Sequence, residues 1–302
     1  IFDSTFIVRN HFGGVDRYRN LPTLHHTLAA ASVRKSQKDE DVLPYLPNAI
    51  YREPILIALD SKAQKVYNYI SEDLMRLLIE ARDNFGSNFN LASHYGQMRA
   101  DDPMNDLSGY AQGLGPMLED LPKKPKLDAA IKYLKDHLDI DPTYKAVIFA
   151  SYLGSVKEIY NALAIAGIES VQYTGKINAK EKEDAKVLFQ HSPDCRVFIS
   201  SDAGGYGVDL PQANLLVNYD QPWSSGLAVQ RNGRINRASS TWPTITIQDI
   251  LISGSIEQRQ HDTLKQKSNI ANAILDGQGI NSKGGVDLTV GSLIDFLTNK
   301  LI

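Results

Sequence analysis

Alternation between short apolar runs and amphipathic helical periods is the feature of this sequence that most limits its fold. The pattern predicts helices over 126–138, 155–166, 179–190 and 226–234, and strands over 145–150, 169–173, 196–200, 214–219 and 244–252. Strands that alternate with helices predict βαβ units, and therefore an α/β fold with an open parallel sheet flanked by helices. In such sheets ligands bind beyond the carboxyl ends of the strands.

The residues before about 125 have a different pattern. A helical period covers 61–82, whereas 83–122 is rich in Asn, Gly, Ser, Asp and Pro, which is typical of loops and short helices. The segment 121–126, Leu-Pro-Lys-Lys-Pro-Lys, is the best linker candidate, and we expect it to be a solvated hinge. The predicted organisation is a mainly helical segment over 1–125, an α/β lobe over 126–275, and a linker with a short helix over 276–302.

Composition and charge exclude several classes of protein. The single cysteine, Cys195, cannot form an internal disulfide and leads into an apolar run, so we expect it in the core. A net charge of -3 argues against a wholly basic nucleic-acid binder but allows a local basic stripe. The sequence has neither a signal peptide nor an apolar run of about 18 residues, so we expect no membrane partner. It opens Ile-Phe-Asp-Ser, and we expect it to begin inside a longer protein.

Two segments look unlike ordinary scaffold. The first, 200–210, follows a buried strand and reads Ser-Ser-Asp-Ala-Gly-Gly-Tyr-Gly-Val-Asp-Leu. Its glycines would let the backbone approach a ligand, and its last carboxylate could hold a ribose hydroxyl or an arginine. A turn that only needs positive φ explains the same glycines equally well.

The second segment, 230–237, reads Gln-Arg-Asn-Gly-Arg-Ile-Asn-Arg. Three arginines in one short stretch repel one another unless an anion lies among them, and a guanidinium suits phosphate oxygens. Arg234 and Arg237 are three residues apart, so on a helical turn they would point the same way. A solvated basic patch is the alternative.

The order of these segments resembles superfamily-two helicases. Residues 230–237 resemble their sixth motif and 200–210 their fifth, while 146–152 resembles the fourth. Residues 216–223, Leu-Val-Asn-Tyr-Asp-Gln-Pro-Trp, and the basic segment 33–42 followed by Leu46-Pro47 are similar to the Swi/Snf branch. The start of a helix at 254–258 extends the resemblance to about residues 12–275.

The sequence also departs from the family's pattern. Residues 238–240 are Ala-Ser-Ser where the family usually has Ile-Gly-Gln, Asp209 stands where many members have asparagine, and Lys176 replaces a small hydroxyl residue. These departures favour a distant branch, bacterial or viral and cytoplasmic, or nuclear if the source is a eukaryote.

The resemblance implies a RecA-like fold and a role for each motif residue. Arg234 and Arg237 would be arginine fingers, with Gln230 as their polar partner. The ATP-binding residues that it implies are Gly205, Gly207, Asp209 and Arg231. The nucleic-acid-binding residues that it implies are Ser151, Thr174, Gly175, Ser201 and Trp223. The implied partners are DNA, contacted through its backbone, and a first RecA-like lobe.

That first lobe is absent from this chain. No Gly-x-x-x-x-Gly-Lys-[Ser/Thr] loop and no Asp-Glu-x-His-like box occurs in the sequence, so ATP and Mg²⁺ would be held only in the full-length protein. We expect an ATP-dependent DNA translocase whose second lobe alone is inactive. The rival hypothesis is a non-catalytic lobe that binds DNA or a partner. A dinucleotide-binding oxidoreductase is excluded, because 204–207 does not fit Gly-x-Gly-x-x-Gly.

Overall fold

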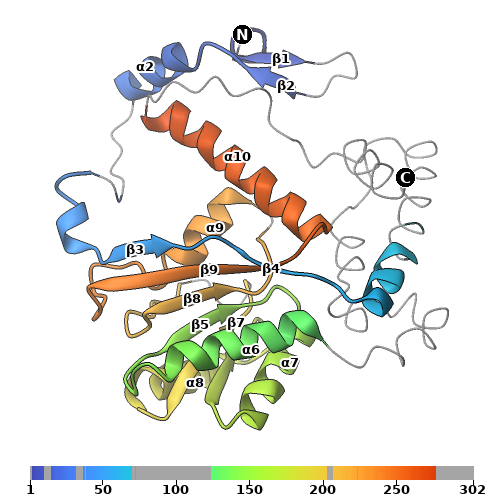
Figure 1. Cartoon of the computed structure of the whole chain (residues 1–302). Helices are drawn as coiled ribbons and strands as arrows, with labels where there is room; N and C mark the ends of the chain where they lie inside the picture. The colour runs from blue at the N-terminus through green and yellow to red at the C-terminus, as the bar shows by residue number, and fades with distance from the viewer. Residues whose placement is uncertain are drawn as a thin grey trace.

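The computed structural model describes residues 2–9, 15–31, 37, 39–69, 72, 124–202, 207–222 and 224–276. Its centre is a parallel sheet with the strand order β3-β9-β8-β5-β7-β6 (Figure 1). The strands are β3 (Asn48–Tyr51), β4 (Ile55–Ile57), β5 (Ala146–Phe149), β6 (Glu169–Tyr173), β7 (Cys195–Ser200), β8 (Leu215–Asn218) and β9 (Thr244–Ile252). All five strands predicted beyond residue 126 are present, and the predicted parallel α/β sheet is confirmed.

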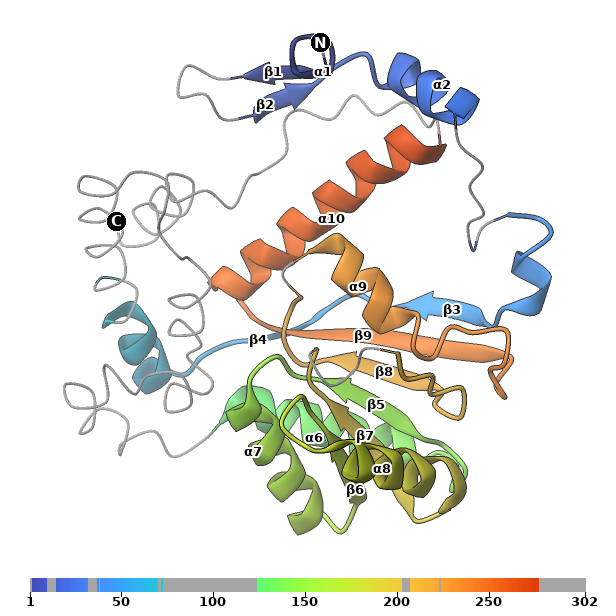
Figure 2. The same ribbon diagram turned by 180° about the vertical axis from the view of Figure 1, so that it is seen from behind.

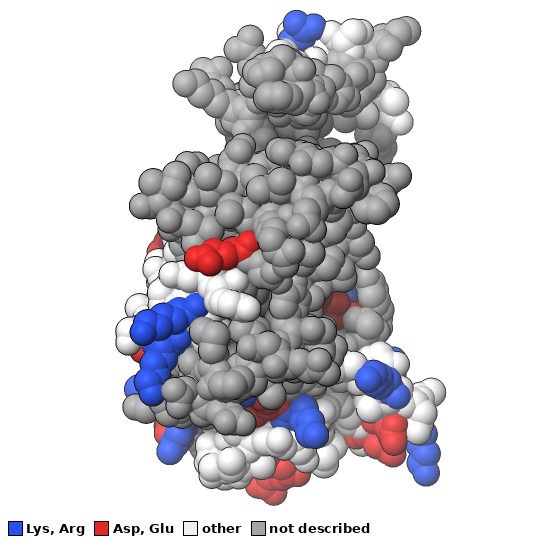
Figure 3. All heavy atoms as spheres, turned by 90° about the vertical axis from the view of Figure 1, so that its right-hand side faces the viewer, with Lys and Arg blue, Asp and Glu red and all other residues white. Residues whose placement is uncertain are grey.

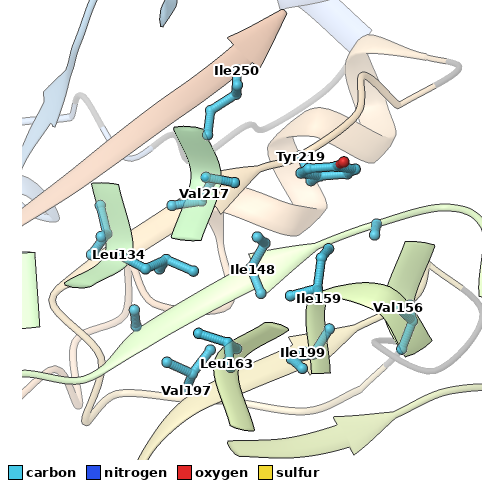
Figure 4. Packing of buried hydrophobic residues seen from close by; sticks show 14 of the residues in the cluster. Leu134, Ile148, Val156, Ile159, Leu163, Val197, Ile199, Val217, Tyr219 and Ile250 are labelled. Carbon is cyan, nitrogen blue, oxygen red and sulfur yellow. The ribbon is translucent and has the colours of Figure 1, made fainter. Parts of the chain in front are cut away.

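Helices cover both faces of the sheet. Helices α6 (Pro125–Leu138) and α7 (Leu153–Ile165) pack on one face, and α8 (Ala179–His191) packs on the other. The four residues of β5 alternate between the two cores, with Ile148 facing α6 and α7 and Phe149 facing α8. Figure 4 shows the first core, where Leu134 of α6 and Ile159 of α7 lie in one cluster with side chains from β5, β7, β8 and β9. A strand buried on both faces needs a continuous apolar run, which explains why β5 and β8 were predictable.

Two strands on the edge of the sheet were not predicted. Strand β3 pairs with residues 244–247 of β9, and β4 pairs with 250–252 of the same strand, so the two lie in line along one edge. The parallel sheet therefore includes residues well before 125. Both strands are short and partly exposed, and their pairing partner lies almost 200 residues later in the chain.

The remaining described elements extend from this edge. Helix α9 (Ser225–Asn232) follows β8, and α10 (Ile256–Asp276) follows β9. Both ribbon views show α10 between the sheet and the N-terminal elements, α1 (Phe2–Phe6), β1 (Ile7–Arg9), β2 (Val15–Tyr18) and α2 (Leu21–Ala31) (Figures 1 and 2). A 3-10 turn, η1 (Leu43–Tyr45), precedes β3. The predicted helix over 61–82 is confirmed at 61–69 and 72, while its other residues and the short helix predicted within 276–302 lie outside the described residues.

The prediction of a solvated hinge at 121–126 is wrong for its last residue, Lys126. Lys126 is fully buried in the first turn of α6, where its Nζ donates to Glu257 of α10 and lies 4.8 Å from the ring centroid of Tyr219. Lys124, just before the helix, pairs with Glu158 in a partly exposed position. The chain is therefore anchored where α6 begins, because a buried ammonium needs a partner of opposite charge.

Cys195 is fully buried at the start of β7, as predicted, and burial raises the pKa of its thiol to about 11.

None of the described helices combines the length and the apolar character needed to cross a bilayer. Figure 3 shows Lys, Arg, Asp and Glu side chains scattered among the described atoms of one side face. The described part of that face therefore carries charges of both signs.

Candidate nucleotide and nucleic-acid interface

The carboxyl ends of three neighbouring strands place polar side chains at one edge of the sheet. Ser151 follows β5, Asp202 follows β7 and Asp220 follows β8, and β5 lies between β7 and β8. Parallel strands end on the same side, so these three loops meet there. Arg231, on α9, lies among them and is only 1% exposed.

Arg231 holds the three loops together. Its Nε and Nη2 donate to the two carboxylate oxygens of Asp202 at 2.6 and 2.8 Å, a bidentate pair. Its Nη1 donates to the backbone oxygen of Asp220 at 2.7 Å, and its Nη2 also donates to Ser151 Oγ at 3.0 Å. We call Ser151, Asp202, Asp220 and Arg231 the Arg231 cluster.

The electrostatics of the Arg231 cluster keep the guanidinium charged. Burial lowers the pKa of Arg231, but the hydrogen bond to Asp202 and the charges of Asp220 and Asp202 outweigh it, so the pKa lies above its ordinary value. The ring of Phe149 lies below the guanidinium, with its centroid 5.3 Å from the Cζ atom. The ATP-binding role implied for Arg231 stays a prediction, since in this structure the side chain joins strand ends inside the lobe.

Ser151 is likewise engaged within the cluster. Its backbone N–H donates to Asp220 Oδ2 at 2.7 Å and its hydroxyl donates to Asp220 Oδ1 at 2.6 Å. The loops after β5 and β8 are therefore linked twice by one residue. The role implied for Ser151 in nucleic-acid binding stays a prediction, and its hydroxyl would have to exchange one of these partners to reach a phosphate.

Helix α9 starts and ends at residues suited to those positions. Ser224 is the N-cap, and its hydroxyl accepts a hydrogen bond from Leu227 N at 3.2 Å. Gly233 follows the last helical residue, and a Cβ there would lie 3.1 Å from the carbonyl oxygen of Val229, closer than nearly all such contacts. The helix ends at Asn232, two residues earlier than predicted, so Arg234 and Arg237 lie in the turn that follows it.

This arginine turn packs on the glycine-containing loop 207–210. The carbonyl oxygen of Arg234 accepts from Leu210 N at 2.9 Å, and its Nη1 donates to the carbonyl oxygen of Val208 at 3.3 Å. Arg237 pairs with Asp209 at 2.9 Å. The structure thus brings together four of the residues singled out from the sequence: Gly207, Asp209, Arg234 and Arg237.

The two arginines differ in exposure, and the expectation that they point the same way stays a prediction. Arg234 is 9% exposed, whereas the side chain of Arg237 is 43% exposed and that of Asp209 is 56% exposed. Within the described part of the chain, Nε of Arg237 is buried and has no hydrogen-bond partner. Gln230 is exposed on the last turn of α9, next to Arg231.

The other predicted contacts follow β6 and β7. Thr174 and Ser201 are 5% and 4% exposed, and Ser201 N donates to the carbonyl oxygen of Tyr173 at 3.1 Å, which ties the two strand ends together. Gly175 is exposed next to Thr174. Gly207 has a φ of 76°, so the loop needs a glycine there. Gly205 and Trp223 lie outside the described residues.

Asp202 and Asp220 were inside the motifs singled out from the sequence but were given no role. The signal that could have found them is a carboxylate directly after each of two buried strands, with an arginine-rich helix to follow. Asn236, which lies between Arg234 and Arg237 in the chain, donates to Gln37 Oε1 at 3.3 Å. The sequence gives no sign of that contact, which joins residues 199 positions apart.

Among the described residues, no cluster of three or more His, Cys, Asp or Glu side chains could hold a metal ion.

Residues 126–239 match the helicase conserved C-terminal domain. Over 162 residues, 53% of this chain and 10% of the relative, the sequence is 25% identical to the chromatin-remodelling ATPase INO80 of Kluyveromyces lactis. Over 156 residues, 51% of this chain and 15% of the relative, it is 26% identical to an uncharacterised ATP-dependent helicase of Schizosaccharomyces pombe. The chain thus spans a small part of the length of these curated relatives.

Solved structures with the same fold include parts of two ATPases, Fun30 and the SWI2/SNF2 ATPase of Sulfolobus solfataricus. The C-terminal part of the Fun30 ATPase domain has a TM-score of 0.53 at 16% identity and covers 77% of this chain and 100% of its own. The SWI2/SNF2 ATPase core of Sulfolobus solfataricus in complex with dsDNA has a TM-score of 0.55 at 19% identity. The match covers 91% of this chain and 56% of the solved one. The C-terminal domain of that ATPase has a TM-score of 0.53 at 17% identity, and the match covers 84% of this chain and 96% of the solved one.

Proposed function

We propose that this chain, which carries the helicase C-terminal lobe of a Swi/Snf-type superfamily-two protein, is one of two motor lobes of an ATP-driven DNA translocase. The observation that carries the proposal is the arginine turn after α9. It presents Arg237, partly exposed, beside Arg234 and against the loop 207–210. Phosphoryl transfer needs positioning and positive charge rather than covalent help from the protein, and such a turn supplies both.

Arg237 is suited to the role of an arginine finger. Among the described residues the side chain of Arg237 pairs with Asp209, and an exposed ion pair of this kind is worth about 1 kcal/mol or less. A γ-phosphate carries more charge than one carboxylate, so it can displace Asp209 at little cost. Arg234, anchored to the carbonyl oxygen of Val208, would hold the turn in place and add a second positive charge.

In this proposal ATP and Mg²⁺ lie between this lobe and a first RecA-like lobe. The first lobe would hold the phosphates and the metal ion, as the resemblance implies. This chain would contribute Arg234 and Arg237, with Gln230 as their polar partner and Gly207 and Asp209 on the nucleotide-facing loop. The Arg231 cluster would fix α9 to the strand ends, so that the arginine turn keeps its place when the cleft closes.

DNA is the proposed nucleic-acid partner, because one structural neighbour is a complex with dsDNA. Thr174, Gly175, Ser201, Ser151 and Trp223 would lie along its backbone. Contacts to phosphates give binding that depends steeply on salt and hardly on sequence. Titration of the chain with two unrelated duplexes at low and moderate salt tests this; a strong preference for one duplex would refute it.

The curated relatives named above are fungal, so they give no support to a bacterial or viral source. Since one is a chromatin-remodelling ATPase, we favour the nuclear alternative for the location. A fluorescent fusion of the full-length protein, imaged in its own cells, tests this; an even cytoplasmic signal would contradict it.

The alternative function is a lobe that binds DNA or a partner without hydrolysis. Steady-state ATP hydrolysis by the full-length protein, with and without DNA, separates the two. The motor proposal expects turnover that DNA stimulates. Nucleic-acid binding with no hydrolysis under either condition would favour the alternative.

A further inference from the structure

The loop between β8 and α9 is held by hydrogen bonds to three consecutive carbonyl oxygens. That of Asp220 accepts from Arg231 Nη1 at 2.7 Å, within the Arg231 cluster. Those of Gln221 and Pro222 both accept from the side-chain Nε2 of Gln260, at 3.3 and 3.0 Å. The loop is thus held by α9 on one side and by α10 on the other.

Gln260 is buried where it makes these bonds, at 3% exposure, and Gln221 is also buried, at 7%. A buried carbonyl oxygen that loses its donor keeps the full cost of desolvation, so water does not simply replace the amide. Replacing Gln260 by an apolar residue would therefore free the loop to move in search of other donors. Helix α10 itself cannot follow, because Glu257 holds it to α6 and to Ile252 N.

We infer that Gln260 is a positioning residue for the arginine turn, which it reaches through the loop and α9. The loop leads within two residues to Ser224, the N-cap of α9, and α9 leads within two residues to Arg234. The Arg231 cluster fixes the last turn of the helix, and Gln260 fixes the chain that enters the first turn. A change at Gln260 thus tilts α9 about its fixed end. This inference rests on the proposed function, because it assigns Gln260 an effect on ATP turnover.

The same helix offers a matched control. Gln258 also bonds the backbone through its side chain, with its Oε1 accepting from Gly254 N at 2.7 Å, but this bond is exposed and involves no residue of the loop. Gln258→Met thus removes a comparable bond without freeing the carbonyl oxygens of Gln221 and Pro222. Gln260→Met keeps side-chain length and removes the donor, and Gln260→Asn is a milder variant that keeps the amide but shortens its reach.

Two measurements on the full-length protein test the inference. Hydrogen exchange should become about tenfold faster at the amides of Leu227 and Ala228, in the first turn of α9, for Gln260→Met and to a smaller degree for Gln260→Asn. The kcat for DNA-stimulated ATP hydrolysis should fall by about tenfold with an unchanged KM for ATP, because misplacement of the arginine turn affects the transition state and not ATP binding. Gln258→Met should change neither.

The outcomes separate this inference from the proposed function. Unchanged exchange at Leu227 and Ala228 in a folded Gln260→Asn protein would overturn the inference, as would faster exchange with unchanged kcat. Arg237→Ala, measured alongside, tests the function: wild-type turnover in that variant would refute the arginine fingers, whatever the exchange at α9. Lost turnover in Arg237→Ala with an unaffected Gln260→Met would leave the function standing and refute the inference.

Discussion

Replacing Lys126 by methionine should destabilise the lobe far more than a surface lysine would. The side chain of Lys126 is fully buried and that of Glu257 is 6% exposed. The substitution fills a similar volume but leaves the buried carboxylate of Glu257 without the Lys126 ammonium, while its Oε2 still accepts from Ile252 N. Removal of one partner from a buried ion pair costs about 3 to 5 kcal/mol.

The assay is chemical denaturation of the chain, followed by circular dichroism. In thermal unfolding, 1 kcal/mol corresponds to about 2 to 4 °C for a domain of this size, so the same loss would lower Tm by about 6 to 20 °C. Lys124→Met is the control, because the Lys124–Glu158 pair is partly exposed and worth about 1 kcal/mol or less. The double variant Lys126→Met/Glu257→Gln should recover most of the loss, since the buried negative charge is removed together with the positive one. A single Lys126→Met variant as stable as Lys124→Met would refute the reasoning.

Three further predictions concern single residues. Cys195, buried and with a pKa of about 11, should not react with iodoacetamide at pH 8 until the protein is unfolded; labelling of the native protein would contradict this. The hydrogen bond and charge of Asp249 raise the pKa of His261, so this pair stabilises the fold below the unfolded pKa of about 6.5 and the effect is lost as pH rises through the folded pKa. His261→Gln should therefore cost more unfolding free energy at pH 5.5 than at pH 9, measured by denaturant titration. Gly207→Ala should destabilise by about 1 kcal/mol in the same assay, because φ is 76° and no atom crowds the added methyl; an unchanged midpoint would argue against it.

The strands buried on both faces of the sheet were predictable because each consists of consecutive apolar residues, a pattern that is local in the sequence. Strands β3 and β4 were not, because what makes them strands is their pairing with β9, and no local pattern encodes a partner almost 200 residues away. Lys126 illustrates the same limit for a single side chain. It has the sequence setting of a linker lysine, and only Glu257, 131 residues later, makes it part of the core.

The candidate site was predictable to the level of its motifs. The sequence and the resemblance together singled out the loop 207–210 and the arginine turn, and the structure brings them into contact. The sequence does not distinguish the three arginines of 230–237 from one another. Arg231 is buried because Asp202 and Asp220 lie opposite it, whereas Arg237 is at the surface, and this division depends on where α9 ends.

The most direct test of the central claim is turnover of ATP by the full-length protein with saturating DNA, compared among wild type, Arg234→Ala and Arg237→Ala. Exposed Arg52, beside α6 and away from the arginine turn, supplies the control Arg52→Ala, which should match wild type. The account predicts that Arg237→Ala lowers turnover by roughly 10³ to 10⁵ while ATP and DNA still bind, and that Arg237→Lys restores little, because a point charge does not reproduce the planar fork. Wild-type turnover in both alanine variants would contradict the account.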